Sequence, residues 1–342
     1  MTAYFVRRFL LIIPTFLGIT VAVFVITHFV PGGPVERQLM RYRMAAIGEG
    51  GAAGGGGVSV SLTEDAVDEI RRYYGFDKPV HVRYGLWLWK VVHLDLGNSW
   101  VYQEPVWDVI KSRFPISIFL GLTGFLLSYL VCIPLGVFKA IRHGSRFDFL
   151  SSALVFIGYA IPGWALGTAL LVFLGGGSFW SIFPLGGFRP DNWAYLGVWG
   201  KITGQIHYMF LPVLCYMVGS FATDTILTKN SLMENLGQDY VRTAFAKGLT
   251  ERRVIFVHAP RNSLIPIVTG LGHVISLMLA GSFLIERVFN IDGMGYLGYN
   301  AILQRDYPVA LGILVISSML MLIGNILSDM IYAVVDPRIR FT

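Results

Sequence analysis

Residues 228–262 read TKNSLMENLGQDYVRTAFAKGLTERRVIFVHAPRN and lie between two long apolar runs. This stretch is polar and mostly compatible with helix, and it carries six lysines and arginines against three acids. Within it, Tyr240–Gly248 (YVRTAFAKG) combines small residues with cations and ends in a glycine. A chain embedded in a membrane has little reason to build such a loop unless something outside the membrane docks there. We therefore interpret 228–262 as a docking site for a partner outside the membrane.

The composition places the rest of the chain in a membrane. Of the 342 residues, 54% are hydrophobic and 14% are charged, whereas a soluble domain carries about 25% charge. Several apolar runs approach or exceed the roughly 20 residues that cross a bilayer. We expect an all-α, polytopic membrane protein that forms one transmembrane domain over 1–342. Six spans are predicted, at Phe9–Val30, Pro115–Phe138, Phe149–Leu174, His207–Leu227, Leu264–Ile285 and Tyr307–Val335.

The distribution of cations sets the expected orientation. Lysines and arginines gather in 1–8, 139–148, 229–262 and the C-terminal tail, and they are sparser in the other short loops. Because cytoplasmic loops are enriched in these residues, both termini and the 228–262 loop are predicted to face the cytoplasm. The 31–114 stretch then forms a long extracytoplasmic loop. The net charge of +6 is explained by the basic loops and does not indicate nucleic-acid binding.

Two local features are predicted inside the extracytoplasmic stretch. Gly48–Gly57 (GEGGAAGGGG) has the composition of a flexible, low-complexity insert. Thr63 is placed to cap a helix over 64–74, because acids follow it in the first turn.

No catalytic constellation stands out in the sequence. The Gly-rich insert lacks the Gly-Lys-Ser/Thr ending of a phosphate loop, and no Walker A pattern occurs elsewhere. If the system uses ATP, we expect ATP and Mg to be bound by partner subunits and no cofactor to be bound by this chain. The seven histidines are scattered, and Cys132 and Cys215 both lie inside apolar runs. Neither a metal site nor a disulfide framework is indicated.

Four residues within or beside the spans are candidates for a translocation path or a polar seam: Pro162, Asp224, Glu286 and Asp329. Pro162 lies well inside its span, where proline kinks a helix, and the kink serves either a moving path or packing alone. A carboxylate at mid-bilayer costs roughly 2.5–3.5 kcal/mol if it faces lipid, so the acids should face protein or water. Asp329 lies near Asn325 and Tyr332 on one helix face. A proton relay and a structural hydrogen bond are both open for these acids.

The 228–262 loop has the pattern of two short helices at an angle. Val241, Ala244 and Phe245 fall at i, i+3 and i+4 and form one apolar stripe. Ala244 and Gly248 are small at i and i+4, so this helix can approach another surface closely, and Gly248 also suits a helix end. An amphipathic helix lying on the membrane is the alternative, but the interrupted helices favour docking. The expected docking residues are Tyr240, Val241, Arg242, Ala244, Phe245, Lys247, Gly248, Arg252 and Arg253.

The same loop resembles a known family. Residues 239–268 (DYVRTAFAKGLTERRVIFVHAPRNSLIPIV) are similar to the coupling loop of permease subunits from ABC importers of dipeptides and oligopeptides. The Glu-Ala-Ala-x-x-x-Gly signature of that family falls on Arg242, Thr243, Ala244 and Gly248, and this chain departs from it at the first two positions. Segments along nearly the whole chain are also family-like: YYGFDKP, LDLGNS, FPLGGF, GSFLIERVFNIDGMG, ILQRDYPV and YAVVDPRI. GGPV, GSRFD, GYAIP and TKNS look closest to the Yej-type first permease of microcin C and oligopeptide importers.

The resemblance implies a type I ABC importer permease fold in the inner membrane. It further implies a second permease subunit, two ATPase subunits or one fused ATPase, an extracytoplasmic peptide-binding protein and a peptide substrate. Residues 240–253 would be the coupling helix, seated in an ATPase groove. ATP-driven closure of the ATPases would then rock the spans between inward-facing and outward-facing states.

An ion-coupled secondary transporter that works without ATPase subunits is the alternative function. It would use Asp224, Glu286 and Asp329, but such folds usually show internal repeats, and no repeat is visible in this sequence. A membrane-bound enzyme is a third class, and the sequence offers no nucleophile or metal cluster for it.

Overall fold

The computed structural model describes residues 2–29, 78–176, 179–269 and 282–335. The described chain is helical throughout, and β-type pairing occurs in it only at two isolated bridges, so the all-α class is confirmed. The helices are α1 (Thr2–Phe29), α4 (Val80–Val92), α5 (Val106–Ile141), α6 (Arg146–Ala160), α7 (Gly163–Leu174), the 3-10 helix η1 (Trp193–Tyr195), α8 (Val198–Leu236), α9 (Asp239–Ala246), α10 (Glu251–Arg253), the π-helix η2 (Val254–His258), α11 (Ala259–Ser263), α12 (Ile265–Thr269), α14 (Phe283–Val288), α15 (Met294–Leu303) and α16 (Tyr307–Val335).

The described residues contain four helices that are long and apolar enough to cross a membrane, namely α1, α5, α8 and α16. The helix pair α6 and α7 adds a fifth span if the bent pair is counted as one. Most of the predicted span Leu264–Ile285 lies outside the described residues, as do the Gly-rich insert and the helix predicted over 64–74. The four or five apolar spans among the described residues confirm the polytopic membrane class.

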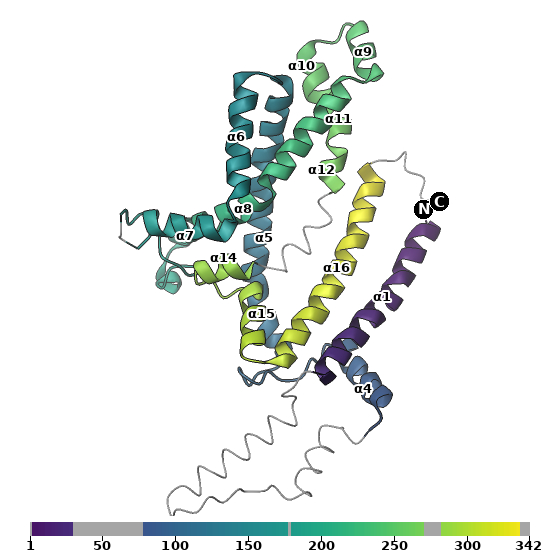
Figure 1. Cartoon of the computed structure of the whole chain (residues 1–342), viewed down its shortest axis with the longest axis vertical. Coiled ribbons are helices and arrows are strands. Elements are labelled where there is room, and N and C mark those ends of the chain that lie inside the picture. The colour runs from purple at the N-terminus through teal and green to yellow at the C-terminus, as the bar shows by residue number, and fades with distance from the viewer. Residues whose placement is uncertain (1, 30–77, 177–178, 270–281, 336–342) are drawn as a thin grey trace, which may run out of the picture.

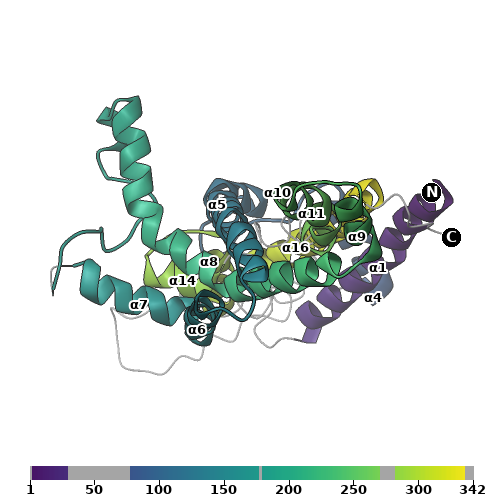
Figure 2. The ribbon, with the colours of Figure 1, turned by 90° about the horizontal axis from the view of Figure 1, so that it is seen from above.

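The spans are arranged as two groups of helices (Figure 1). In the first group, α5 packs along α8, and α6 packs on α8 beside it. In the second group, α1 packs against α16, and α16 also contacts α5, α12 and α15. Seen from above, α7 and the start of α8 extend away from the other helices (Figure 2). Large apolar side chains such as Leu130, Phe149 and Leu154 remain exposed on the outer faces, as a lipid environment requires.

The predicted span Phe149–Leu174 is broken instead of kinked. Helix α6 ends at Ala160, Ile161 is extended, and α7 starts after Pro162 at an angle of 95° to α6. A proline disfavours the α conformation in the residue before it, which explains the extended Ile161. A Cβ at Gly163 would lie 2.7 Å from the carbonyl oxygen of Cys215, so glycine lets the break sit directly on α8.

Helix α8 is longer than predicted at both ends. The prediction placed this span at His207–Leu227, whereas the helix runs from Val198 to Leu236 and ends before Gly237. The predicted boundary followed hydropathy, but residues 228–236 contain no glycine or proline and continue the helix although they are polar. The 228–262 loop therefore begins as the last turns of a membrane-spanning helix.

Candidate functional site

The candidate site is the helical hairpin formed by α9, α10 and η2, which lies at the extreme end of the molecule (Figure 1). Helix α9 starts at Asp239, whose carboxylate suits the positive end of a helix. It ends at Ala246, and Gly248 follows two residues later with φ +79° and donates its N–H to the Phe245 carbonyl at 2.9 Å. A left-handed φ favours glycine, so Gly248 sets the angle between the two arms of the hairpin.

A small internal core holds the two arms together. Val241 and Ala244 of α9 pack with Val254 at the start of η2, and all three are buried, while Leu249 covers them in part. Val241, Ala244 and Phe245 were predicted to form one apolar stripe of the docking helix. The first two instead face the returning arm because the chain turns back at Gly248, and only Phe245 is presented at the surface, with 45% of it exposed.

Gly248 itself has no neighbouring atom within 4 Å of the position that a Cβ would occupy. Its role within this chain is therefore the backbone conformation, since no close approach inside the chain requires a glycine there. The predicted close approach to another surface concerns a partner and stays a prediction.

The outer surface of the hairpin combines aromatic residues with cations. Tyr240, Phe245 and Phe256 are exposed. The four basic residues of the predicted docking set are exposed as well: Arg242, Lys247, Arg252 and Arg253. Protein interfaces are enriched in aromatic residues and arginine. This surface, built on its own core at the end of the molecule, suits insertion into a cleft of another protein.

The hairpin is connected firmly to helix α8. One arm continues directly from α8, and the other returns through η2 and α11, which packs on α8. The Ser231 hydroxyl of α8 donates to the Ser263 carbonyl of α11 at 2.8 Å. Leu232 and Ala259 pack in one buried cluster with Ala140 of α5. A displacement of the hairpin would therefore act directly on the end of α8.

Asp224 lies in a polar seam between α8 and α5. It is half-buried and accepts a hydrogen bond from Ser220, one turn earlier on α8. The Ser220 hydroxyl lies 3.4 Å from that of Ser128 on α5, and the neighbouring Tyr129 donates to the Ile267 carbonyl of α12 at 3.0 Å. The seam joins three helices through uncharged partners.

Glu286 of α14 is fully buried and is satisfied by neutral donors. Its carboxylate accepts from the Tyr296 N–H at 2.7 Å, from the Tyr216 hydroxyl at 3.2 Å and from the Ser282 N–H at 3.3 Å. Tyr296 lies in the first turn of α15, where backbone N–H groups attract an anion. A Cβ at Gly293 would lie 2.6 Å from the carboxyl carbon, so this glycine makes room for the acid. The geometry is that of a structural cap on α15.

Asp329 forms an ion pair with Arg8 of α1. Asp329 was predicted to lie in a polar seam with Asn325 and Tyr332, and its cationic partner, 321 residues away in the chain, was not predicted. The pair ties the start of α1 to the end of α16. The structure does not gather the four path candidates into one site: Pro162 lies at the α6–α7 break, and the three acids lie on α8, α14 and α16.

Sequence reasoning missed two buried acids. Asp148 of α6 is surrounded by lysines from α5 and α8. Asp306, before α16, accepts from the Ser99 hydroxyl at 2.5 Å and from the N–H groups of Trp100 at 3.1 Å and Val101 at 3.2 Å. In the sequence, both acids stand in short polar segments that suggest exposure to solvent, and no spacing signal points to their distant partners.

The Asp306 turn lies beside an ion pair in which the Arg113 guanidinium is 2.8 Å from the Asp292 carboxylate. The Arg113 guanidinium stacks 5.5 Å from the ring centroid of Tyr102. Burial raises the pKa of the Tyr102 phenol, and the arginine opposes this shift. The ion pair and the stacking connect α5 and the loop before it to the segment between α14 and α15.

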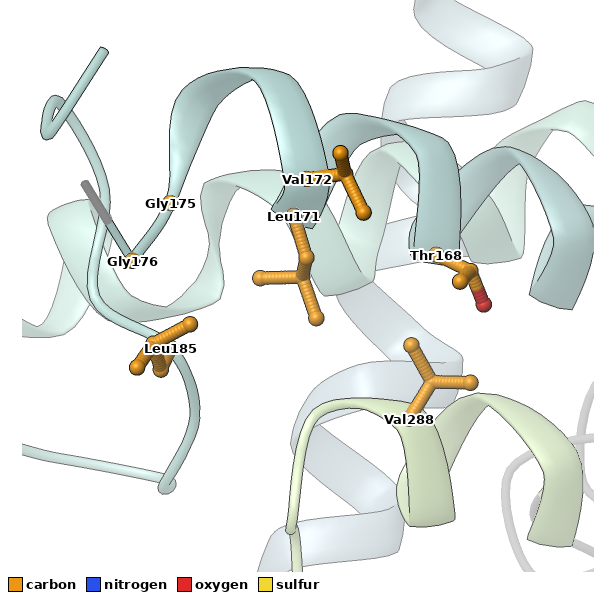
Figure 3. A pocket seen from close by; sticks show the side chains of 7 residues that line it. All are labelled: Thr168, Leu171, Val172, Gly175, Gly176, Leu185 and Val288. Atoms are coloured by element: carbon orange, nitrogen blue, oxygen red, sulfur yellow. The ribbon is translucent and has the colours of Figure 1, made fainter. Parts of the chain in front are cut away.

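An apolar pocket of about 370 Å³ lies between α7 and α14 (Figure 3). Its lining consists of Thr168, Leu171, Val172, Gly175, Gly176, Leu185 and Val288. The one hydroxyl among them, that of Thr168, donates to the Trp164 carbonyl at 3.0 Å. The pocket offers apolar contact and no charge, and none of the predicted site residues line it.

The apolar spans define a polytopic membrane protein, and its exposed basic and aromatic hairpin suits contact with a protein outside the membrane. Residues 132–341 match the family described as binding-protein-dependent transport system inner membrane component. The chain is 41% identical to the inner membrane ABC transporter permease protein YejB of Escherichia coli O157:H7, over 100% of this chain and 99% of that protein. It is 39% identical to the peptidoglycan transport system permease protein YejB of Agrobacterium fabrum, with the same coverage. It is 34% identical to the oligopeptide transport system permease protein AppB of Bacillus subtilis, over the full length of both chains.

The chain therefore belongs to the family of binding-protein-dependent transport system inner membrane components, and it is a multi-pass permease of the ABC transporter class. The predicted resemblance to peptide permeases, and to the Yej-type subgroup in particular, is confirmed.

Proposed function

We propose that this permease carries peptides into the cytoplasm as one half of the membrane channel of an ATP-driven importer. The observation that carries the mechanism is the α9–α10 hairpin, whose internal core displays Phe245 and cations at the end of α8. The peptide class is supported by relatives over the full length of the chain that are named for oligopeptide or dipeptide transport.

The proposed assembly contains a second permease, two ATPase subunits or one fused ATPase, and an extracytoplasmic peptide-binding protein. ATP and Mg are bound and used by the ATPases, and this chain has no catalytic role of its own. Both termini and the hairpin face the cytoplasm, whereas 31–114 faces outside and receives the binding protein. Residues 1–342 form one transmembrane domain, with 228–262 as its coupling loop.

The proposed cycle follows from differential binding of the hairpin. The ATPases hold it in different places when they are open and when they are closed, and this difference shifts the spans between two states. Helix α8 conveys the displacement because α9 follows it after only Gly237 and Gln238, and α11 packs back on it. Asp224, in the seam between α5 and α8, is the acid that we assign to the path.

The test is an affinity purification from the native membrane in mild detergent, with the partners identified by mass. The wild-type chain is compared with Phe245→Asp and with the matched control Phe245→Leu. The exposed position leaves the hairpin core intact in both variants. We expect the wild type and the leucine variant to retain a second permease and ATPases, and the aspartate variant to lose only the ATPases. Recovery of the wild type alone, or as a homomer, would overturn the importer and favour an ion-coupled carrier.

A further inference from the structure

A buried ionic cluster joins α5, α6 and α8 just before the hairpin. We define the Asp148 cluster as Lys139 near the end of α5, Asp148 in the first turn of α6, and Lys229 on α8. The side chains of these residues are 1%, 8% and 15% exposed. Lys229 lies seven residues before the last residue of α8, Leu236, so the cluster is close to the start of the hairpin.

The cluster is fully hydrogen-bonded. The Lys229 Nζ atom lies 2.8 and 2.7 Å from the two carboxylate oxygens of Asp148. The Lys139 Nζ atom lies 3.3 Å from one of these oxygens, and it donates to the hydroxyls of Ser151 at 2.9 Å and Ser152 at 2.6 Å. On the exposed side, His143 Nδ1 lies 3.3 Å from the carboxylate. The Asp148 carboxylate thus binds lysine side chains from two other long helices, α5 and α8.

A close contact of α5 with α8 lies directly beside the cluster. A Cβ at Gly136 would lie 2.5 Å from the Cβ of Thr228 and 2.9 Å from the Thr225 carbonyl oxygen. Gly136 is one turn before Lys139, and Thr228 precedes Lys229. The axial position of α5 against α8 is therefore fixed at this level, and the cluster adds α6 to the pair.

Helix α6 has little other attachment. Of its residues, only Asp148 and Val155 are buried, and large side chains such as Phe149 and Leu154 are more than 70% exposed. Burying charges does not by itself favour folding, because desolvation offsets the attraction between them. The cluster instead defines one position of α6 on α8, since the carboxylate can meet both ammonium groups only there.

We propose that the Asp148 cluster is a mechanical link that makes α6 follow α8 when the hairpin is displaced. This inference rests on the proposed function, in which an ATPase moves the hairpin. Asp148, Lys139 and Lys229 are positioning residues that act through α6. Beyond the Pro162 break, α7 packs directly on α8 and on α14, so the cluster completes the attachment of the broken span to α8.

The test uses the whole transporter in proteoliposomes, with Lys229→Met and the conservative variant Lys229→Arg. Methionine keeps the length and apolar stem of the side chain, and it leaves Asp148 paired with Lys139. The measured quantities are labelled tripeptide taken up per ATP hydrolysed, the ATPase rate, and the amount of assembled complex. We expect the methionine variant to assemble and hydrolyse ATP, while uptake per ATP falls about tenfold, within the range of coupling between sites. The arginine variant should restore most of the ratio.

An unchanged uptake per ATP in Lys229→Met would overturn the link and leave the proposed function intact. Loss of uptake, ATPase rate and complex in the same proportion would also overturn it, because the cluster would then be structural only. Failure of the wild-type complex to take up peptide with ATP would overturn the proposed function, and the link with it.

Discussion

The two ends of the molecule hold their buried acids in different ways. At the hairpin end, Asp148 is bound by the ammonium groups of Lys139 and Lys229, which come from two other long helices. At the opposite end, Asp306 is bound by one hydroxyl and two backbone N–H groups of the 99–101 turn. Both acids join segments that are distant in the sequence: Asp306 ties the start of α16 to the turn before α5, and Asp148 ties α6 to α5 and α8. The difference lies in the partners, because Asp306 is held by donors of a single turn and Asp148 by charged side chains of two helices. Loss of Asp306 should therefore loosen one turn, whereas loss of Asp148 should loosen the packing of three helices.

The largest loss of stability is expected when the carboxylate at the hairpin end is removed. Asp148→Ala leaves Lys139 charged, buried and without its ionic partner. Breaking a buried pair in this way costs about 3–5 kcal/mol. We expect a large drop in the thermal unfolding temperature of the detergent-purified chain, and Asp148→Glu should recover part of it. An unfolding temperature equal to that of the wild type would show that the cluster does not stabilise the packing of α5, α6 and α8.

A smaller loss is expected at the opposite end. Asp306→Asn keeps the shape and one acceptor oxygen, but it replaces a charged acceptor by a neutral one and introduces an NH₂ group facing N–H donors. Hydrogen bonds to charged groups contribute about 1.5–3 kcal/mol, which sets the expected cost. Limited proteolysis within 94–105 should accelerate in this variant, while the hairpin should be cut at an unchanged rate. Equal acceleration at both ends would remove the distinction between them.

Two helix glycines test how closely α5 packs on α8 at the hairpin end. Gly136→Ala places a Cβ against Thr228, and overpacking of this kind costs about 1–3 kcal/mol. Gly158→Ala is the matched control, because nothing lies within 4 Å of a Cβ there. The control should be neutral, or more stable by about 0.5–1 kcal/mol. Chemical denaturation of both variants measures the difference, and equal stabilities would contradict the close contact of α5 with α8.

The smallest effect is expected in the hairpin itself. Gly248→Ala keeps all packing but forces a left-handed φ on a residue with a Cβ, which costs about 1–2 kcal/mol. Gly248→Asn should cost less, because asparagine adopts this conformation more readily. Amide hydrogen exchange of 239–254 should increase in the alanine variant and change little in the asparagine variant. The opposite order would show that the side-chain space, and not φ, decides this position.

Local rules predicted the parts of the fold that depend on neighbouring residues. The helix end before Gly248 and the interruption at Pro162 follow from backbone preferences. The long apolar runs predicted α1, α5 and α16, although α5 starts at Val106 and not at the predicted Pro115. Hydropathy failed at the end of α8, where polar residues continue the helix. It also could not show that Val241 and Ala244 face the returning arm, because that depends on the direction in which the chain turns back.

The pairings of the acids could not be predicted, for a physical reason. Asp329 pairs with Arg8 across almost the full chain, and Asp148 with Lys229 across 81 residues. Such contacts are decided by the packing of helices and leave no spacing pattern in the sequence. Family resemblance supplied the function of the hairpin, but it did not supply these contacts.

Coupling of the hairpin to ATP hydrolysis can be measured as uptake of a labelled tripeptide into proteoliposomes that contain the purified transporter and its binding protein. We expect uptake that requires Mg and ATP, proceeds without an ion gradient, and is lost in Phe245→Asp but kept in Phe245→Leu. Uptake driven by a proton gradient in the absence of ATP, and unaffected by Phe245→Asp, would contradict it.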